Sequence, residues 1–235
     1  MSSIFSSFPN GFRALVIGAS GGIGNAFIEY LKSDPHCGLA IGISRSSSPS
    51  IDFEDEQSIK LAAAALTQQG PFHLIINAAG ILQTDQFSPE RKIDQLSYAQ
   101  MEQMFRVNTM GPALVLQQFG KLLAPQRSVL AIVSAKVGSI GDNRLGGWYS
   151  YRASKAAVNM MVKTAAIEVK RRLPNAVIVA LHPGTVDTAL SAPFKGAQLG
   201  RKASTAAADM LATLNQLQPD QSGGFFAYDG EQLPF

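Results

Sequence analysis

The sequence has few cysteines and histidines and no long apolar run. Its 235 residues include one cysteine, Cys37, so an internal disulfide is excluded, and its three histidines, His36, His73 and His182, show no metal-ligand spacing. No apolar run approaches the roughly 18 residues that cross a bilayer. The opening stretch "MSSIFSSFPNGF" lacks a basic segment followed by an apolar one. We therefore expect a cytoplasmic protein with no metal and no membrane partner.

Charged residues are also sparse, at 16% of the chain against 46% hydrophobic residues. This balance is typical of globular rather than disordered chains, and the length fits a single domain over residues 1–235. The formal charge is +3, and the one dense basic run, Lys170–Arg172, falls where a helix is predicted to end, which suits the helix dipole. The alternative is a nucleic-acid patch, but no aromatic residues are interleaved with the run. We expect no nucleic-acid partner.

Short β-type runs alternate with longer helical patterns along the chain. The predicted strands lie near 12–18, 39–44, 72–77, 128–134, 176–184 and 223–230. The predicted helices lie near 22–33, 55–68, 97–121, 149–172 and 202–217. This alternation predicts an α/β fold with a parallel sheet covered on both faces. The stretches without periodicity, at about 81–96, 134–148 and 189–201, should converge at the carboxyl ends of the strands as substrate loops.

The run "LVIGASGGIG" (15–24) joins the first predicted strand to the first predicted helix. At such a turn the N–H groups of the helix start can meet a pyrophosphate, and glycine permits its close approach. The spacing G-x-x-x-G-x-G also arises by chance in a glycine-rich chain, so a turn that binds nothing is the alternative. The candidate cofactor contacts here are Gly18, Ser20, Gly21, Gly22, Ile23 and Gly24.

The end of the second predicted strand indicates which dinucleotide binds. An acidic residue there usually binds the ribose 2′-hydroxyl of NAD, whereas an arginine accommodates the 2′-phosphate of NADP. This chain has Ser44, Arg45 and Ser46 at that position. The sequence therefore favours NADP over NAD, and the alternative is that Arg45 is a solvated loop cation.

Two residues of the predicted helix 149–172 form a candidate acid–base pair. Tyr151 and Lys155 are four residues apart and therefore share a helix face. A tyrosine with a pKa near 10 is a poor base at neutral pH, but an adjacent ammonium and an oxidised nicotinamide would lower that pKa. Tyr149 is a rival, but the residue four positions after it is Ala153. We therefore expect Tyr151 to exchange a proton with a substrate oxygen.

Five short motifs occur in a fixed order along the chain. They are "GASGGIG" (18–24), "NAAG" (77–80), Asn108, Tyr151 with Lys155, and "PGTVDT" (183–188). In this order, and over nearly its full length, the chain resembles the short-chain dehydrogenases/reductases. The stretch 137–160 looks most similar to their carbonyl-reductase branch, the C-signal-like and sniffer-like proteins. The resemblance implies a single Rossmann-type domain with a doubly wound parallel sheet, a nicotinamide cofactor, hydride transfer at a carbonyl or alcohol, and a homo-oligomer.

The resemblance also implies roles for individual residues. Tyr151 corresponds to the proton donor in reduction, and Lys155 to the residue that binds the nicotinamide ribose and lowers the pKa of the tyrosine. Asp52 resembles the acidic residue near adenine. The other implied cofactor contacts are Asn77, Ala78, Ala79 and Gly80 on the adenosine side, and Pro183, Gly184, Val186 and Thr188 on the nicotinamide side. For Asp52 and these positions, an ordinary loop or strand-end role is the alternative.

Asn108 lies inside the predicted helix 97–121, which opens on Ser97 as N-cap with Gln100 as capping-box partner. Pro112 has no N–H for the Asn108 carbonyl, and its ring crowds that carbonyl, so a kink is predicted. A water could then link the carbonyl to Lys155, which matches the proton-relay role of the asparagine in the family. The alternative is a kink that serves packing alone.

The chain departs from the family pattern at the serine that holds the substrate oxygen. The usual pattern is Ser-Ser-x-x-Gly, whereas this chain has Ser134, Ala135 and then Gly138, so alanine stands at the catalytic position. Ser134 acting through a shifted loop, Ser139, or no serine at all could fill the role. We take Ser134 as the candidate. Loss of one such hydrogen bond would cost about 10²–10³ in rate, by analogy with oxyanion holes.

Three functions compete on these motifs. The first is an NADPH-dependent reductase of a small carbonyl, or the reverse oxidation of an alcohol. The second is a catalytically weak NADP-binding sensor or signalling protein, with Ala135 as the sign of decayed catalysis. The third, an epimerase or dehydratase of nucleotide sugars, normally has a longer C-terminal substrate domain. Candidate apolar walls for a substrate, or for packing alone, are Leu82, Phe87, Trp148, Leu190, Phe194 and Leu199.

Overall fold

Six parallel strands in the order β2-β1-β3-β4-β5-β6 form the central sheet. The computed structural model describes residues 4–194 and 196–235, so residues 1–3 of the predicted domain and residue 195 of the predicted loop 189–201 lie outside the described residues. The strands are β1 (Phe12–Ile17), β2 (Cys37–Ile43), β3 (Leu74–Asn77), β4 (Ser128–Val133), β5 (Ala176–His182) and β6 (Phe225–Ala227). The helices are α1 (Gly22–Ser33), α2 (Glu56–Ala65), α3 (Tyr98–Phe105), α4 (Gly111–Phe119), α5 (Tyr149–Arg172), α6 (Gly196–Leu199) and α7 (Ala203–Gln216).

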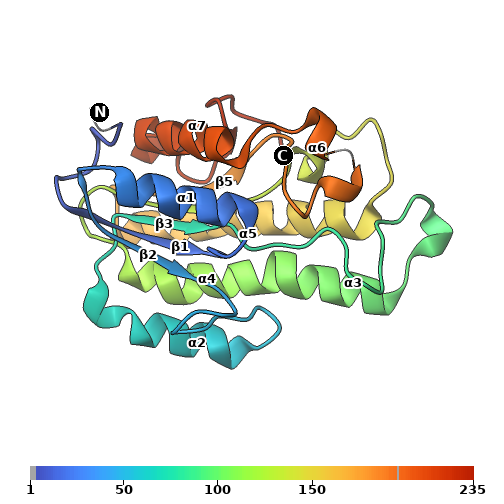
Figure 1. The fold of residues 1–235 in the computed structure, drawn as a ribbon, viewed down its shortest axis with the longest axis horizontal. Helices are drawn as coiled ribbons and strands as arrows, with labels where there is room; N and C mark the ends of the chain where they lie inside the picture. The colour runs from blue at the N-terminus through green and yellow to red at the C-terminus, as the bar shows by residue number, and fades with distance from the viewer. Residues whose placement is uncertain (1–3, 195) are drawn as a thin grey trace.

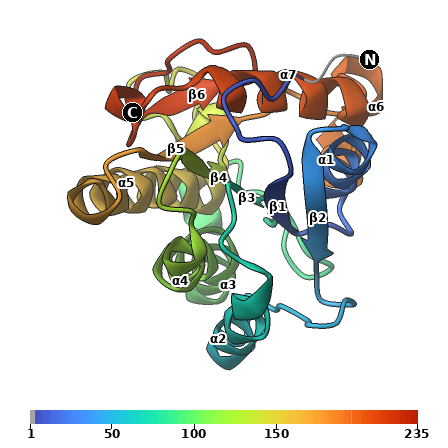
Figure 2. The ribbon, with the colours of Figure 1, turned by 90° about the vertical axis from the view of Figure 1, so that its left-hand side faces the viewer.

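Helices cover both faces of this sheet, with α1 and α7 on one side and α2, α4 and α5 on the other (Figure 1, Figure 2). Successive strand residues point to opposite faces, so each strand supplies two apolar clusters. In β1, Leu15 and Ile17 belong to the cluster with α4 and α5, whereas Ala14 and Val16 belong to the cluster with α1 and α7. The predicted doubly wound α/β fold is therefore confirmed.

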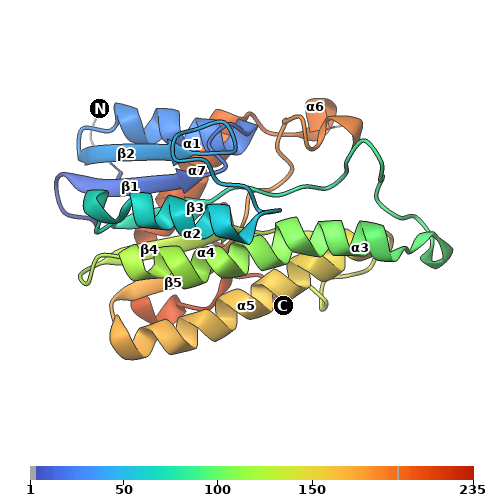
Figure 3. The same cartoon turned by 90° about the horizontal axis from the view of Figure 1, so that it is seen from below.

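The register of the strands places their carboxyl ends along one edge of the sheet. Ile17 pairs with Ile43 of β2 and with Asn77 of β3, and Asn77 in turn pairs with Ile132 of β4. The turns that follow these strands therefore meet at the same edge, where ligands bind in open parallel sheets. The chain between β3 and α3, which contains loop 81–96, extends beyond the sheet at this end (Figure 3).

The predicted helix 97–121 is interrupted by a wider turn. Residues Arg106–Met110 form a single π-helical turn between α3 and α4, in which the Gly111 N–H donates to the Arg106 carbonyl. This turn lies just before Pro112, which cannot supply a helical N–H to the Asn108 carbonyl, and the predicted kink itself stays a prediction. Ser97 is the N-cap, as predicted, but Gln100 does not complete a capping box, since its side-chain amide donates to a loop carbonyl instead.

Membrane spans and metal clusters are both absent from the described residues. Within 4–194 and 196–235, no helix has the length and apolarity needed to cross a bilayer. Nor do these residues contain three or more His, Cys, Asp or Glu side chains grouped to hold a metal ion. The basic run Lys170–Arg172 is the last turn of α5, where its charges suit the helix dipole as predicted.

Candidate functional site

Two adjoining cavities open at the carboxyl edge of the sheet. The first, of about 460 Å³, is lined by the turn after β1, the end of β2 and the loop after β3. The second, of about 300 Å³, is lined by the loops after β3, β4 and β5 and by the start of α5. The segment 78–81 lines both, so a single ligand can extend from one to the other. Their volumes are those of ordinary ligand sites.

The glycine-rich turn after β1 is shaped for a close-lying anion. Gly18 has a φ of +84°, and a side-chain carbon there would lie 2.7 Å from the nitrogen of Ala79, so this turn and the loop after β3 pack together only with glycine. At Gly22 such a carbon would lie 2.8 Å from a methyl group of Thr188. Helix α1 starts at Gly22 without a side-chain cap, so its first N–H groups can bind an anion. The pyrophosphate of a dinucleotide fits this turn.

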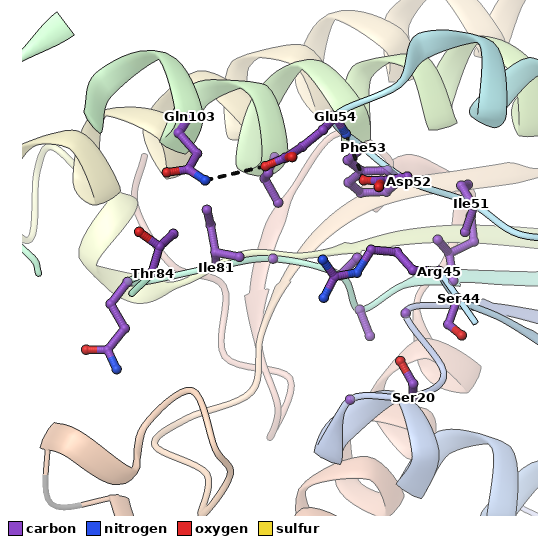
Figure 4. A pocket seen from close by; sticks show the side chains of 18 of the residues that line it. Ser20, Ser44, Arg45, Ile51, Asp52, Phe53, Glu54, Ile81, Thr84 and Gln103 are labelled. Atoms are coloured by element: carbon purple, nitrogen blue, oxygen red, sulfur yellow. Dashed lines mark hydrogen bonds between the residues drawn. The ribbon is translucent and has the colours of Figure 1, made fainter. Parts of the chain in front are cut away.

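Arg45 extends from the end of β2 into the first cavity (Figure 4). Its side chain is exposed, and no hydrogen bond or ion pair joins it to the described residues. Asp52 and Glu54 line the same cavity, and the Asp52 carboxylate accepts the N–H of Glu54 at 3.0 Å. Two side chains at this end of the cavity are therefore relevant to a ligand. Arg45 is a cation available to a phosphate, and the Asp52 carboxylate is held by its own turn.

Two buried asparagines shape the loop after β3. The side-chain oxygen of Asn77 accepts the N–H of Ala79 at 3.1 Å. Asn108 binds the backbone of Ile81 twice, because its oxygen accepts the N–H at 2.9 Å and its nitrogen donates to the carbonyl at 2.8 Å. Both asparagines are fully buried. They fix the segment that the two cavities share, and neither lines a cavity.

Tyr151 and Lys155 lie one turn apart near the start of α5 and both line the second cavity. They are 8% and 4% exposed, and the Lys155 Nζ atom is 5.8 Å from the centre of the Tyr151 ring. Nζ donates to the Val133 carbonyl at the end of β4, at 3.1 Å. No hydrogen bond joins the Tyr151 hydroxyl to the described residues, so a substrate oxygen can take it.

Burial moves the pKa values of this pair in opposite directions. It raises the pKa of Tyr151 above its ordinary value and lowers the pKa of Lys155 to about 8, because the charged form of each is disfavoured in an apolar site. Burial therefore sets the direction of the Tyr151 shift in the protein alone, and the expectation that Lys155 and an oxidised nicotinamide lower the pKa of Tyr151 stays a prediction. Tyr151 is protonated at neutral pH.

Ser134 and Ser139 are both committed to the protein. The Ser134 hydroxyl is 3% exposed and donates to the side-chain oxygen of Asn159 on α5, at 2.7 Å. A hydroxyl has one hydrogen to donate, so this bond opposes the role expected for Ser134 at a substrate oxygen. The Ser139 hydroxyl accepts the N–H of Asp142 at 3.0 Å, and Ser139 lines neither cavity. Ser134 and Ala135 both line the second cavity.

His182 is a cavity residue that the sequence reasoning considered only as a metal ligand. It ends β5 and lines the second cavity, and its Nδ1 atom is buried with no partner among the described residues. Burial, with a smaller effect of the Lys136 charge, lowers the pKa of His182 to about 4, so the imidazole is neutral at neutral pH. Its place directly before Pro183 and Gly184 is the signal that could have identified it.

Trp148 forms a wall of the second cavity beside Tyr151. Its φ of 54° makes it the sole non-glycine in the left-handed region among the described residues, a conformation that costs roughly 1–3 kcal/mol. The indole packs edge-on against Tyr151 and Phe194, with ring centres 6.1 Å and 5.1 Å apart. Phe87, by contrast, lines neither cavity. The other predicted wall residues that line the second cavity are Leu82, Leu190, Phe194 and Leu199.

Most of the predicted cofactor contacts line one of the two cavities. Those in the first are Gly18, Ser20, Gly21, Ser44, Arg45, Asp52, Ala78, Ala79 and Gly80. Those in the second, besides the segment 78–80, are Ile23, Tyr151, Lys155, Pro183, Gly184, Val186 and Thr188. Gly22, Gly24 and Asn77 lie outside both, in positions that hold the turn after β1 and the loop after β3 in shape.

Comparison with known proteins gives matches over most of the chain. A family model described as short chain dehydrogenase matches residues 13–198. The chain is 32% identical over 186 residues to 1-hydroxy-2-glutathionyl-2-methyl-3-butene dehydrogenase of Rhodococcus sp. (strain AD45), covering 79% of this chain and 78% of the relative. It is 34% identical over 168 residues to C-signal of Myxococcus xanthus, covering 71% and 94%.

Solved structures share the whole architecture. The carbonyl reductase Sniffer of D. melanogaster superimposes with a TM-score of 0.81 at 22% identity, covering 97% of this chain and 100% of that one. The NADPH-bound carbonyl reductase from chicken fatty liver gives a TM-score of 0.82 at 25% identity, covering 97% and 96%. With the matched family model and the two relatives above 30% identity, these findings confirm the resemblance read from the motifs. The chain belongs to the short-chain dehydrogenase/reductase family.

Proposed function

We propose that the protein is an NADP(H)-dependent reductase of small carbonyl compounds, with Tyr151 as the proton donor. The observation that carries the proposal is the placement of Tyr151 and Lys155 one turn apart, both buried in the apolar cavity that adjoins the dinucleotide cradle. NADPH bound along the two cavities would supply the hydride. The Tyr151 hydroxyl would donate its proton to the carbonyl oxygen, and the raised pKa of Tyr151 keeps that proton in place until a substrate binds.

Lys155 and the loops around it would hold the nicotinamide end of the cofactor. The charged Nζ atom lies 5.8 Å from the centre of the Tyr151 ring and would bind the ribose hydroxyls. Val186 and Thr188 line the same cavity and would contact the carboxamide. Asn108 would act indirectly, because its side chain binds the backbone of Ile81, which lines both cavities. Each contribution keeps the reacting groups in one geometry, which is how positioning lowers a barrier.

The choice of NADP over NAD rests on Arg45. It is the cation available in the first cavity where the ribose 2′-position would lie, and no described residue pairs with it. NADP or NADPH is also present in several structural relatives, including the chicken liver carbonyl reductase and a short-chain dehydrogenase from Burkholderia cenocepacia. The homo-oligomer and the cytoplasmic location expected from the sequence stay predictions.

A sensor or signalling role is the second candidate, and Ala135 is the observation that favours it. Alanine in place of the family's serine removes a donor to the substrate oxygen, and Ser134 is bonded to Asn159 instead. The C-signal of Myxococcus xanthus is among the relatives. Retention of the buried pair Tyr151 and Lys155 favours catalysis over this alternative.

Replacement of Tyr151 by phenylalanine tests the reductase directly. We expect Tyr151→Phe to lower kcat by at least about 10², the usual contribution of a general acid, while the Kd for NADPH stays within threefold. NADPH consumption is measured over a panel of aldehydes, ketones and diketones. Tyr149→Phe is the control, because Tyr149 is 36% exposed and lines neither cavity. Binding of NADPH without turnover of any wild-type substrate would instead favour the sensor.

Neutralising Arg45 tests the cofactor choice. Arg45→Gln should raise KM for NADPH by about 10- to 100-fold, the range of one charge-assisted hydrogen bond, and leave KM for NADH within twofold. Arg91→Gln, at an exposed position of loop 81–96 outside both cavities, is the matched control. An equal change for the two cofactors would show that Arg45 does not read the 2′-phosphate.

The lowered pKa of Lys155 predicts that activity falls at alkaline pH. As the pH rises through about 8, Lys155 loses the proton that holds the ribose, so kcat/KM for reduction should fall there, whereas Tyr151 stays protonated. The effect is measured by two pH profiles: kcat/KM for NADPH, which reports the enzyme without cofactor, and the Kd for NADPH. The profile of Lys155→Arg should lack this limb, because arginine does not deprotonate. An unchanged limb in that variant would assign it to another group.

The serine substitution predicts opposite effects at two neighbouring positions. Ser134→Ala should lower kcat/KM by less than tenfold, because the Ser134 hydrogen is already donated to Asn159. Ala135→Ser should raise it by tenfold or more, because this position lines the second cavity and would regain a donor to the substrate oxygen. A loss of 10²–10³ in Ser134→Ala would return the role to Ser134.

A further inference from the structure

Glu90 is a buried carboxylate that the proposed reaction does not use. It comes from loop 81–96, is 2% exposed and lines neither cavity. One carboxylate oxygen accepts the N–H of Ser150 at 3.2 Å, and the other accepts the hydroxyl of the same residue. Its backbone carbonyl accepts the N–H of Trp148. A buried charge is costly unless it is hydrogen-bonded, and both partners of Glu90, Ser150 and Trp148, lie at the start of α5.

The start of α5 has no cap of its own. Trp148 is the N-cap residue and makes no side-chain cap, and the first turn of the helix contains no acidic residue. Helix N-termini are ordinarily satisfied by a local Ser, Thr, Asp or Asn and are stabilised by a negative charge. Glu90 supplies both the acceptor and the charge from 60 residues away in the sequence. Loop 81–96 is thereby fixed to the helix that carries Tyr151.

Arg152 fixes the backbone that leads into Trp148. The guanidinium of Arg152 donates to the carbonyls of Gly147 at 2.9 Å, Gly146 at 3.1 Å and Val137 at 3.1 Å. The two residues before Trp148 are thus bound by Arg152, and Ser150, two residues after it, is bound by the Glu90 carboxylate. A strained conformation of a bulky residue persists only where its surroundings over-determine it, and such positions are enriched at functional sites.

We propose that Glu90 is a positioning residue that holds Trp148 in its strained conformation as the wall of the second cavity, so that the indole sets which group of a substrate fits beside Tyr151. The effect on substrate choice rests on the proposed function, whereas the mechanical link from Glu90 to Trp148 does not. A flat, uncharged substituent on the carbonyl carbon would pack against the indole and Phe194. Removing the charge of the Glu90 side chain should weaken its bonds to Ser150, loosen the start of α5 with the adjoining Trp148, and erode that preference.

The sequence contains one tryptophan, so its fluorescence reports on this position alone. Glu90→Gln keeps the shape of the side chain, removes its charge and replaces one of the two oxygens that accept from Ser150 with an NH2 group, so we expect a shifted emission maximum. The acrylamide quenching constant should at least double. Glu102→Gln, which breaks an exposed pair on α3, is the matched control and should leave both values unchanged. Ser150→Ala removes one of the bonds and should change them in the same direction by less.

Kinetics test the specificity half of the proposal. The ratio of kcat/KM for acetophenone to that for propanal should fall at least tenfold in Glu90→Gln, with the loss mainly in KM. Trp148→Gly removes the wall and suits the left-handed backbone, so it should lower the same ratio. If Glu90 acts through Trp148, adding Glu90→Gln to Trp148→Gly should not lower the ratio further, which a double-mutant cycle measures.

The outcomes separate the link between Glu90 and Trp148 from the proposed reductase function. Unchanged emission and quenching in a folded Glu90→Gln protein, with a circular dichroism spectrum like the wild type, would overturn the link to Trp148. If the effects of Glu90→Gln and Trp148→Gly on the substrate ratio are additive in the double-mutant cycle, Glu90 does not act through Trp148. If Glu90→Gln does not fold, Ser150→Ala tests the same link with a smaller perturbation, and unchanged emission and quenching there would overturn it. If the wild type reduces no carbonyl, the proposed function fails, and the fluorescence result still stands for or against Glu90.

Discussion

The parallel register of β1, β3 and β4 is the constraint on which the site depends. Asn77 pairs with Ile17 on one side and Ile132 on the other, so three strands end at one level and their turns meet. A slip of one residue would turn every side chain to the opposite face. Asn77 then closes the turn after its own strand, and Asn108 holds Ile81 a few residues later. The backbone shared by the two cavities is therefore fixed by buried side chains, which leaves its exposed surface available to a ligand.

Burial gives the acid–base pair its chemical character. An apolar site disfavours the charged form of each group, so Tyr151 stays protonated, and the pKa of Lys155 falls to about 8, which still leaves the ammonium predominant at neutral pH. In the proposed reduction, the protein alone presents Tyr151 as a ready acid. The reverse oxidation needs the tyrosinate, and the positive charge of an oxidised nicotinamide beside Lys155 is what would offset the cost of burial. The protonated Tyr151 of the protein alone therefore suits the proposed reduction.

Local signals in the sequence were sufficient for the fold and for most of the cavity walls. Alternating strand and helix patterns predicted the sheet, and α1 and α5 begin and end as expected. The glycine-rich turn after β1 and the end of β2 were predicted as cavity walls because each signal lies within a few consecutive residues. The features that local signals did not predict have a different cause. The burial of Asn77, the net pKa of Tyr151 and the cap supplied by Glu90 depend on residues that are distant in sequence and meet only in the fold.

The bonding of Ser134 shows how one hydroxyl can serve structure where the family uses its neighbour for chemistry. Ser134 bonds to Asn159, and the preceding residue, Val133, accepts the Lys155 ammonium. Lys155 and Asn159 are one helical turn apart, so two consecutive residues at the end of β4 bind two successive turns of α5. This double contact fixes the helix, and with it Lys155, against the strand. Since the hydrogen of Ser134 is used there and position 135 is alanine, Tyr151 is left as the principal donor to a substrate oxygen in the proposed reaction.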